Sequence, residues 1–324
     1  MPLADAGAYL SRDAIHRLRR RSNLRGAWLV LHAWGVVALA MAAFAWWPNP
    51  LTLVAGVVIV GGRQLGLAIL MHDAAHGLLF HSRRVNDWVG RWLCGAPVIA
   101  SMDLYRPYHL THHRRTQQPD DPDLGLSAPF PITRVSLRRK MVRDLTGQTA
   151  YQRRRLQLRD ALGSPAWPWR RRLARAAERI GPGVVVNLVL GAGLTAVGYW
   201  YLYVALWLVP MATWYQLISR IRNIAEHAVV PDNDDPLRNT RTTYAGWLER
   251  AVIAPYFVNY HLEHHLLLFV PCWRLPAAHR VLLEGGFGPR MEIQPGYRAM
   301  LRVATGAASD RGRPDPAPGG AQHI

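Results

Sequence analysis

Three short histidine-rich segments have spacings that are suited to binding metal ions. HLTHH at 109–113 and HLEHH at 261–265 each place histidines at i, i+3 and i+4, and HDAAH at 72–76 has a pair at i and i+4. On a helix these positions share one face, so the imidazoles of each segment can converge on one point. The eight candidate metal ligands are His72, His76, His109, His112, His113, His261, His264 and His265.

The number of clustered imidazoles predicts two metal ions. Imidazole is a good ligand for iron, zinc, copper and nickel. A zinc site seldom uses more than four protein ligands, so eight clustered histidines indicate a pair of ions. An imidazole-rich set has less ligand charge than the glutamate-rich sets of soluble di-iron proteins, which suits iron that changes oxidation state while reacting with dioxygen. Haem held by two histidines is the main alternative, but it does not explain three adjacent imidazoles.

Apolar and basic residues must be segregated along this chain, because its 324 residues are 50% hydrophobic yet carry a formal charge of +18. Apolar residues dominate 27–47 and 51–80, with PNP between them, which predicts a transmembrane hairpin. A second apolar block at 184–219 is long enough for two short spans that fold near 198–201. A cleavable signal peptide over 16–47 is the alternative for the first segment, but a second span follows it at once. Four spans are therefore predicted.

The distribution of arginine predicts the orientation of these spans. The segment just before the first span contains Arg17, Arg19, Arg20, Arg21 and Arg25, and three basic clusters lie within 130–180, whereas the turns at 47–50 and 198–201 carry no charge. By the positive-inside rule, both termini and the middle segment are cytoplasmic, and all three histidine segments fall on that side. Contact with anionic lipid explains the arginine clusters more simply than nucleic acid, because no stacking aromatics or nucleic-acid motif accompany them. No nucleic-acid partner is expected.

The predicted fold is an all-α integral membrane protein with four transmembrane helices and a cytoplasmic, histidine-rich helical cap. Its predicted parts are a basic cytoplasmic N-terminus at 1–26, a transmembrane hairpin at 27–80 that ends in the first histidine segment, a cytoplasmic segment at 81–182 with the second, a second transmembrane hairpin at 183–222, a cytoplasmic cap at 223–304 with the third, and a disordered tail at 305–324. Cys94 and Cys272 have neither metal nor disulfide spacing, so thiolate chemistry is not expected.

The order HxxxH, HxxHH, HxxHH, with these spans, resembles the membrane fatty acid desaturase superfamily. The closing NYHLEHHLLLFVPCWRLPAAHR, at 259–280, is similar to the last histidine segment of its bacterial members. The resemblance implies four spans, a cytoplasmic cap that holds two irons, and dioxygen as co-substrate. The implied activity is the introduction of a double bond into a fatty acyl chain. A hydroxylase or oxygenase acting on a lipid or a small non-lipid metabolite is the alternative, and a non-catalytic membrane protein that binds haem or metal is a third.

The resemblance also implies partners and a location. The 324 residues contain neither the cytochrome domain fused to some relatives nor a CxxxxCxxC-type ferredoxin motif. Electrons are therefore expected from an external donor such as ferredoxin or a b-type cytochrome with its reductase. The other expected partners are the lipid bilayer and an acyl or small hydrophobic substrate. The expected location is the bacterial inner membrane, as a multi-pass protein with both termini and the metal site on the cytoplasmic side.

Three residues outside the histidine segments are further site candidates. Eight imidazoles leave two irons short of ligands, and the resemblance implies that His227 is the ninth. It also implies that Asn223, one helical turn earlier, has a catalytic role by holding a water near the metal. A capping or packing role at the end of the fourth span is the alternative for His227. Arg63 lies inside the second span, where an arginine faces protein or water, and it is expected either to contact another helix or to bind an anionic or polar group of the substrate.

The remaining polar residues near the segments are expected to have supporting roles. Asp73 and Glu263 are expected to orient the imidazole N–H groups of neighbouring ligands. His81 lies on a different helical face from His76 and is left out of the metal set. Four histidines without partners in sequence are expected to be solvent or packing residues, namely His16, His32, His279 and His323.

Overall fold

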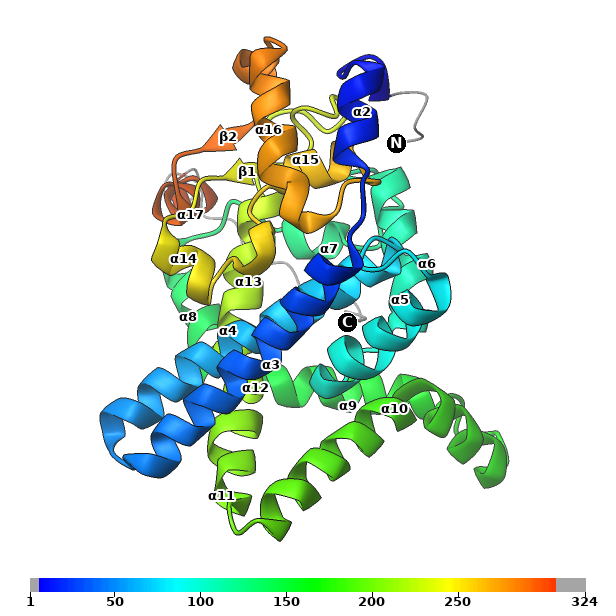
Figure 1. The fold of residues 1–324 in the computed structure, drawn as a ribbon, viewed down its shortest axis with the longest axis vertical. Coiled ribbons are helices and arrows are strands. Elements are labelled where there is room, and N and C mark those ends of the chain that lie inside the picture. Colours follow the sequence, from blue (N-terminus) through cyan, green and yellow to red (C-terminus); the bar gives the residue numbers. More distant parts are fainter. Residues whose placement is uncertain (1–5, 307–324) are drawn as a thin grey trace. The chain divides into compact units, whose positions relative to one another are not determined.

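The computed structural model describes residues 6–306 (Figure 1). The predicted tail therefore lies outside the described residues except for 305 and 306, which end a helix, and His323 lies outside them as well. The chain divides into two compact units that we describe separately. Within the described residues, unit 1 comprises 6–22, 107–140 and 219–306, and unit 2 comprises 23–106 and 141–218.

Four helical segments are long and apolar enough to cross a membrane, as the sequence predicted. They are Asn23–Trp46, Pro50–Ala75, Trp169–Ala196 and Trp200–His227. The first hairpin is formed by α3 (Asn23–Trp46) and α4 (Pro50–Ala75). Asn49 caps α4 by accepting hydrogen bonds from the backbone N–H groups of Leu51 and Thr52, and Pro50 occupies the first helical position, where its missing N–H is tolerated.

Close packing in unit 2 brings the end of the α4 region against the start of α3. A Cβ atom on Gly26 would lie 2.2 Å from the carbonyl oxygen of Leu79, so only glycine permits this approach. Near the middle of α4, the Gln64 Nε2 donates to the carbonyl oxygen of Trp207 at 2.8 Å. This bond ties the second span to the fourth and satisfies a polar group inside an apolar helix.

The fourth span is broken, unlike the first two. It comprises α11 (Trp200–Tyr203), a π-helical turn η3 (Val204–Leu208), α12 (Val209–Ala212) and α13 (Trp214–His227). Pro210 has no N–H for the helical ladder and Thr213 has non-helical backbone angles, which account for the interruption. The third span is α10 (Trp169–Ala196), with Pro182 inside it.

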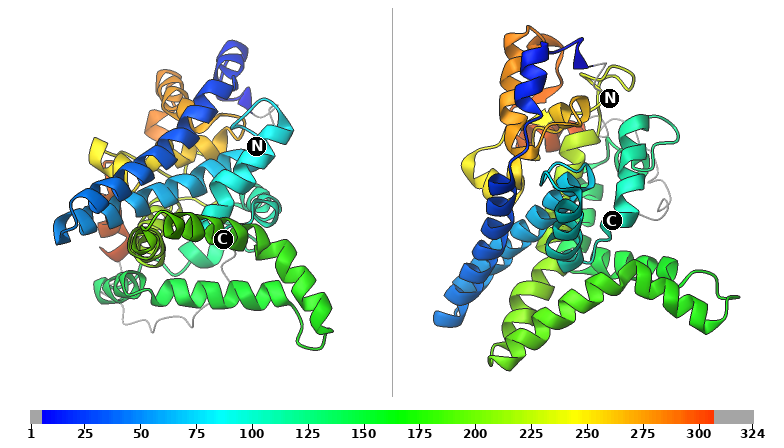
Figure 2. Two further views of the ribbon diagram at one scale, coloured as in Figure 1. Left: turned by 60° about the horizontal axis from the view of Figure 1, so that its bottom comes forward. Right: turned by 45° about the vertical axis from the view of Figure 1, so that its right-hand side comes forward.

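The rest of unit 2 is a set of short helices near α9 (Gln148–Leu162) and α10, whose ribbons are drawn in Figure 2. The short helices are α5 (Arg83–Val89), η1 (Gly90–Gly95) and η2 (Ala96–Val98). The Arg154 guanidinium donates to the carbonyl oxygens of Val98 and Ile99 at 3.0 and 3.1 Å. The Asn187 Nδ2 donates to the carbonyl oxygen of Pro97 at 3.1 Å. These bonds satisfy the carbonyl groups left open where η2 ends.

Unit 1 is built from short helices and long loops. Helix α6 (Met102–Arg115) and helix α8 (Arg134–Leu145) cross the boundary between the units at 106/107 and 140/141. The other helices are α2 (Arg12–Leu18), α7 (Leu124–Ser127), α14 (Trp247–Val252), η4 (Pro255–Phe257), α15 (His261–Leu266), η5 (Cys272–Arg274), α16 (Leu275–Glu284), η6 (Gly288–Arg290) and α17 (Tyr297–Gly306). Two parallel strands of two residues each, β1 (Thr242–Thr243) and β2 (Ile293–Gln294), join the loops. The all-α fold class is therefore confirmed.

Candidate metal centre

Four buried histidines of unit 1 form a compact set, which we call set B. Helix α6 supplies His112, α13 supplies His227, and α15 supplies His261 and His265. Each offers a nitrogen that lies within 4.8 Å of those of the other three, and all four side chains are buried. The i, i+4 spacing within α15 places its two imidazoles on one face, as predicted from the sequence.

Hydrogen bonds at Nδ1 orient two of the four imidazoles of set B, those of His112 and His265. The Nδ1 of His112 donates to the Asp121 carboxylate at 2.8 Å. The Thr116 hydroxyl donates to the carbonyl oxygen of His112, so its oxygen accepts from the Nδ1 of His265 at 3.1 Å. A Glu226 carboxylate oxygen lies 3.6 Å from the Nδ1 of His261. Partners of this kind fix the tautomer and direction of metal-binding imidazoles.

The donor atoms of set B fit a metal ion. The Nε2 atoms of His227 and His261 face each other at 2.9 Å. Around an ion with metal–nitrogen bonds of about 2.1 Å, two ligands at a right angle are about 3.0 Å apart, so the spacing is that of neighbouring ligands. Burial, with the neighbouring His265 and His227 as smaller causes, holds the pKa of His261 well below its ordinary value. A neutral imidazole keeps the lone pair that a metal needs.

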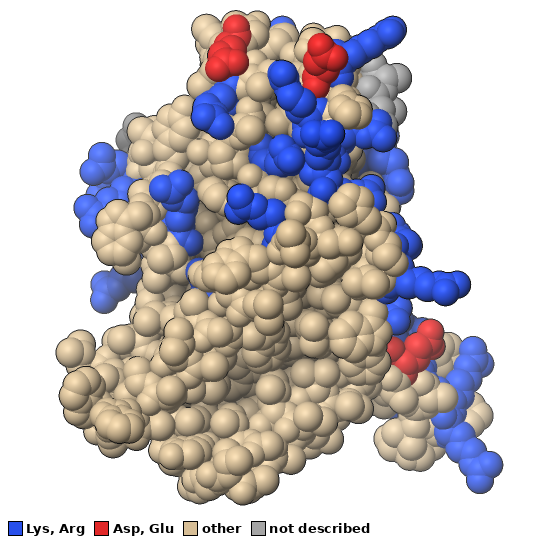
Figure 3. All heavy atoms as spheres, viewed as in Figure 1, with Lys and Arg blue, Asp and Glu red and all other residues tan. Residues whose placement is uncertain are grey.

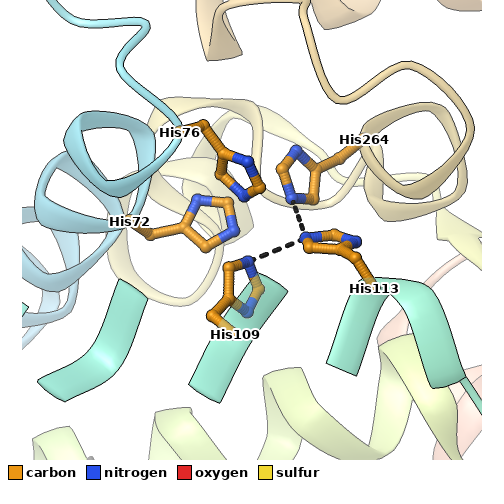
Figure 4. Close-up of side chains that lie close together, drawn as sticks. All are labelled: His72, His76, His109, His113 and His264. Atoms are coloured by element: carbon orange, nitrogen blue, oxygen red, sulfur yellow. Dashed lines mark hydrogen bonds between the residues drawn. The ribbon is translucent and has the colours of Figure 1, made fainter. Parts of the chain in front are cut away.

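A second set, set A, contains three histidines of unit 1. His109 and His113 lie on α6, and His264 lies on α15. The Nε2 of His113 is 2.8 Å from the Nε2 of His109 and 3.0 Å from the Nε2 of His264 (Figure 4). Three ring nitrogens that face one another at this spacing are also arranged as metal ligands. The expectation that all three imidazoles of each segment converge on one point is therefore wrong. In each segment the i and i+4 histidines share a set, and the i+3 histidine, His112 or His264, belongs to the other.

Unit 2 contributes the histidine pair of the first segment. His72 lies in the last turn of α4 and His76 caps that helix, and their ring centroids are 5.0 Å apart. Helix α4 thus presents both imidazoles at one end, as the i, i+4 spacing predicted.

The loop after α6 makes hydrogen bonds to two histidines of set B, His112 and His227. Asp121 accepts from His112 and also from the backbone N–H groups of Gln117 and Asp123, at 2.9 and 2.8 Å. The Gln117 side chain donates to the carbonyl oxygen of His227 at 2.8 Å. Burial alone would lower the pKa of His112, but the Asp121 hydrogen bond and the Asp123 charge outweigh it, so this pKa is raised. Negative charge behind the imidazole favours a cation in front of it.

The supporting carboxylates are not those that the sequence reasoning named. Glu263 accepts from the hydroxyl of Thr242 and from the Nδ1 of His279, so it does not orient a ligand. It lies on the opposite face of α15 and holds that helix to its neighbours. His279 is buried in this contact, so of its two predicted roles, solvent or packing, it has the packing role. The carboxylate of Asp73 is 3.8 Å from the Nδ1 of His72, too far for a hydrogen bond.

The remaining predicted site residues have the following surroundings. His227 is buried in set B, and its Nδ1 has no hydrogen-bond partner within residues 6–306. Asn223 lies four residues earlier on α13 and is half-buried. Arg63 is 5% exposed inside α4. The roles of Asn223 and Arg63 in catalysis and substrate binding remain predictions.

A cavity of about 660 Å³ reaches one histidine from each set. His113 of set A and His265 of set B line it, together with Thr116. The other side chains of its wall are mainly polar and include Arg114, Gln118, Asn233 and Asn239. The cavity gives water and small polar molecules a route to the imidazoles of unit 1.

The same chain matches known membrane oxidases. A sequence model of the family described as "Fatty acid desaturase" matches residues 44–291. The chain is 25% identical over 279 residues to dihydrorhizobitoxine desaturase of Bradyrhizobium elkanii, which covers 82% of this chain and 77% of that protein. It is 25% identical over 269 residues to a beta-carotene ketolase of Paracoccus sp. (strain PC1), covering 83% and 94%.

A third relative is the sn-1 oleoyl-lipid 12-desaturase of Anabaena variabilis, which is 24% identical over 293 residues, covering 82% of this chain and 78% of that protein. The resemblance seen in the histidine segments is thus confirmed over most of the chain. Because the family match spans well over half of the residues and accompanies four apolar helices, the chain is an integral membrane oxidoreductase that belongs to the fatty acid desaturase family.

Proposed function

We propose that the chain holds two iron ions through nine histidines. Set B would bind one iron through four of them. Set A would bind the other through His109, His113 and His264, and we assign His72 and His76 to the metal centre because their segment has the spacing of the family's first histidine segment. The observation that carries this proposal is the inward Nε2 geometry of set B, in which Asp121 and Thr116 each hold an Nδ1 atom. Both sets are made of imidazole nitrogen donors, which are suited to iron.

Two irons held in this way would supply the ability to activate dioxygen and to remove hydrogen from an unactivated carbon. Among the protein's own residues, Asp121 and Thr116 orient the imidazoles of His112 and His265. Electrons would come from an external donor such as ferredoxin or a b-type cytochrome with its reductase. The proposed reaction is desaturation of an acyl chain.

A second candidate is hydroxylation or ketone formation on a lipid-soluble substrate. It is favoured by the beta-carotene ketolase, which this chain matches over 94% of that protein's length. A small non-lipid metabolite is a further possible substrate, in view of the dihydrorhizobitoxine desaturase. Desaturation removes a second hydrogen from the substrate, whereas hydroxylation returns oxygen to the carbon. The two reactions are therefore separated by their products.

The deciding experiment is mass spectrometry of lipids, carotenoids and small metabolites from cells with and without the gene. A product lighter than its precursor by two hydrogens supports desaturation. A product that contains oxygen from labelled dioxygen supports hydroxylation or ketone formation. If iron-loaded protein with a reducing system left all three classes unchanged, the oxidase proposal would be contradicted.

We assign His227 as the ninth ligand and Asn223 as a residue that holds water near the metal. Replacing His227 by alanine should lower iron content and abolish turnover, whereas Asn223→Ala should reduce turnover with a smaller loss of iron. Arg63→Leu should leave iron content intact and weaken turnover if this side chain orients the substrate. Full iron and full turnover in His227→Ala would refute the ninth ligand.

We also propose that both termini and the metal site face the cytoplasm of a bacterial inner membrane. The arginine-rich segments before α3 and between the two hairpins support this orientation. Fusions of a cytoplasmic reporter to each terminus should be active. An active periplasmic reporter at either terminus would contradict the four-span orientation.

A further inference from the structure

Helix α9, the loop at 163–168 and the first part of α10 form an arginine-rich elbow in unit 2. Residues 148–179 contain nine arginines and two acidic residues, which leaves a formal charge of +7. Figure 3 shows basic side chains at the lower right, where the start of α10 lies in the same view in Figure 1. This charge is a feature that the proposed oxidation does not use.

The elbow includes the first part of α10, which is the third candidate membrane span. Figure 1 shows α10 bending near its middle, and Pro182 lies inside the helix. The part after Pro182 exposes Leu188 and Val189, at 67% and 65%, as expected of a helix that contacts lipid chains. The part before it carries the arginines. One continuous helix therefore passes from a basic surface into an apolar one.

The acidic residues of the elbow do not neutralise its arginines. The Asp160 carboxylate lies 3.7 Å from the Arg175 guanidinium and 3.3 Å from that of Arg179. Four other arginines of the elbow have no carboxylate partner in the part of the chain that the structure describes, and all four are exposed. They are Arg155, Arg159, Arg170 and Arg171.

Tryptophan side chains share the elbow with these arginines. The Arg171 guanidinium lies 4.0 Å from the ring centroid of Trp167, and that of Arg172 lies 5.2 Å from the ring of Trp169. Trp169 is 58% exposed and Leu173 is 47% exposed. Indole rings prefer the depth of the lipid headgroups, and stacking holds the guanidinium groups at that depth.

We infer that this elbow is a binding surface for anionic phospholipid headgroups. Exposed guanidinium groups without carboxylate partners match headgroup phosphates, while Trp169 and Leu173 enter the boundary with the acyl chains. An acidic protein would complement the charge equally well but would not explain the exposed tryptophan and leucine at the entry of a span. The inference goes beyond the oxidase function and does not depend on it.

The test is native mass spectrometry of the full chain in detergent, titrated with phosphatidylglycerol or with phosphatidylcholine of the same acyl chains. The elbow variant is R155Q/R170Q/R171Q. The matched control is R280Q/R298Q/R302Q, which removes three exposed arginines from α16 and α17 of unit 1. Iron content and thermal unfolding of each variant report whether it is folded.

The wild type and the control should retain phosphatidylglycerol preferentially, and the elbow variant should lose this preference by roughly tenfold or more, because each arginine near an anionic surface contributes. Soluble glycerol phosphate at the same concentration should not compete. Equal retention of both lipids by the wild type, or an equal loss in the control, would overturn the inference. An elbow variant that keeps the lipid preference but needs more electron donor for half-maximal turnover would instead identify an acidic protein partner, and would also overturn it.

Discussion

Asp121→Asn tests whether a carboxylate outside the histidine segments maintains set B. The native Asp121 accepts three hydrogen bonds, from the Nδ1 of His112 at 2.8 Å and from the backbone N–H groups of Gln117 and Asp123 at 2.9 and 2.8 Å. Asparagine has nearly the same shape, but one of its two acceptor oxygens is replaced by an NH₂ donor. At least one of the three native donors must then face another donor.

The expected loss of iron affinity follows from the known effect of removing a hydrogen-bond partner from a metal-binding histidine. Removing the hydrogen-bond partner of a metal-binding histidine typically lowers metal affinity by about 10–100-fold. This corresponds to about 1.4–2.8 kcal/mol of binding free energy. An unsatisfied buried donor adds about 1–3 kcal/mol to the loss of folding stability. Asp121→Asn should therefore lose iron from set B first and should unfold at a lower temperature.

The assay is the iron content of purified protein after dialysis against increasing concentrations of a chelator. Asp120→Asn is a matched control, because it removes the same charge one residue away. Asp120 is exposed and its carboxylate pairs with Arg115, an interaction that contributes little at a surface. If Asp121→Asn retained iron as well as Asp120→Asn at every chelator concentration, Asp121 would have no part in metal binding.

Two further predictions concern the packing and the charge of unit 2. Gly26→Ala should destabilise the protein by about 1–3 kcal/mol because its Cβ would meet the carbonyl oxygen of Leu79, whereas Gly35→Ala, with open space around it, should be neutral or stabilising in thermal unfolding. Burial tends to raise the pKa of Asp87, but hydrogen bonds from Arg106 outweigh it and the pKa is lowered. A lowered folded-state pKa contributes stability above the unfolded value of about 3.9 and loses it as pH falls through the folded value. Asp87→Asn should therefore unfold at a lower temperature than the wild type at pH 7, and the difference should shrink below about pH 4; an equal difference at both pH values would contradict the ion-pair explanation.

The histidine sets were predictable because their signal is local. The i, i+4 pairs His109/His113 and His261/His265 each share a set, and α6 and α15 form over those residues. The division into two sets was not predictable, because His112 and His113 are adjacent and only the packing of three helices sends them to different sets. The supporting carboxylates were missed for the same reason. Glu226 meets His261 across 35 residues of chain.

An acidic run after the second segment did carry a usable signal. TQQPDDPD begins three residues after His113 and contains both Asp121 and Gln117. The end of the second span, in contrast, could be predicted only approximately from the sequence. Apolar residues run to Phe80, but α4 ends at Ala75, because Gly77 adopts φ +73 and Asn86 accepts a hydrogen bond from the Leu79 N–H. Composition locates an apolar run, whereas turns and side-chain caps decide where its helix stops.

The most direct test of the two-iron proposal is the metal content of the purified full chain, with its absorption spectrum measured on the same sample. The seven histidines of sets A and B, together with His72 and His76, predict two non-haem irons per chain and no Soret band. One iron per chain, a haem spectrum, or stoichiometric zinc in active protein would contradict the proposal.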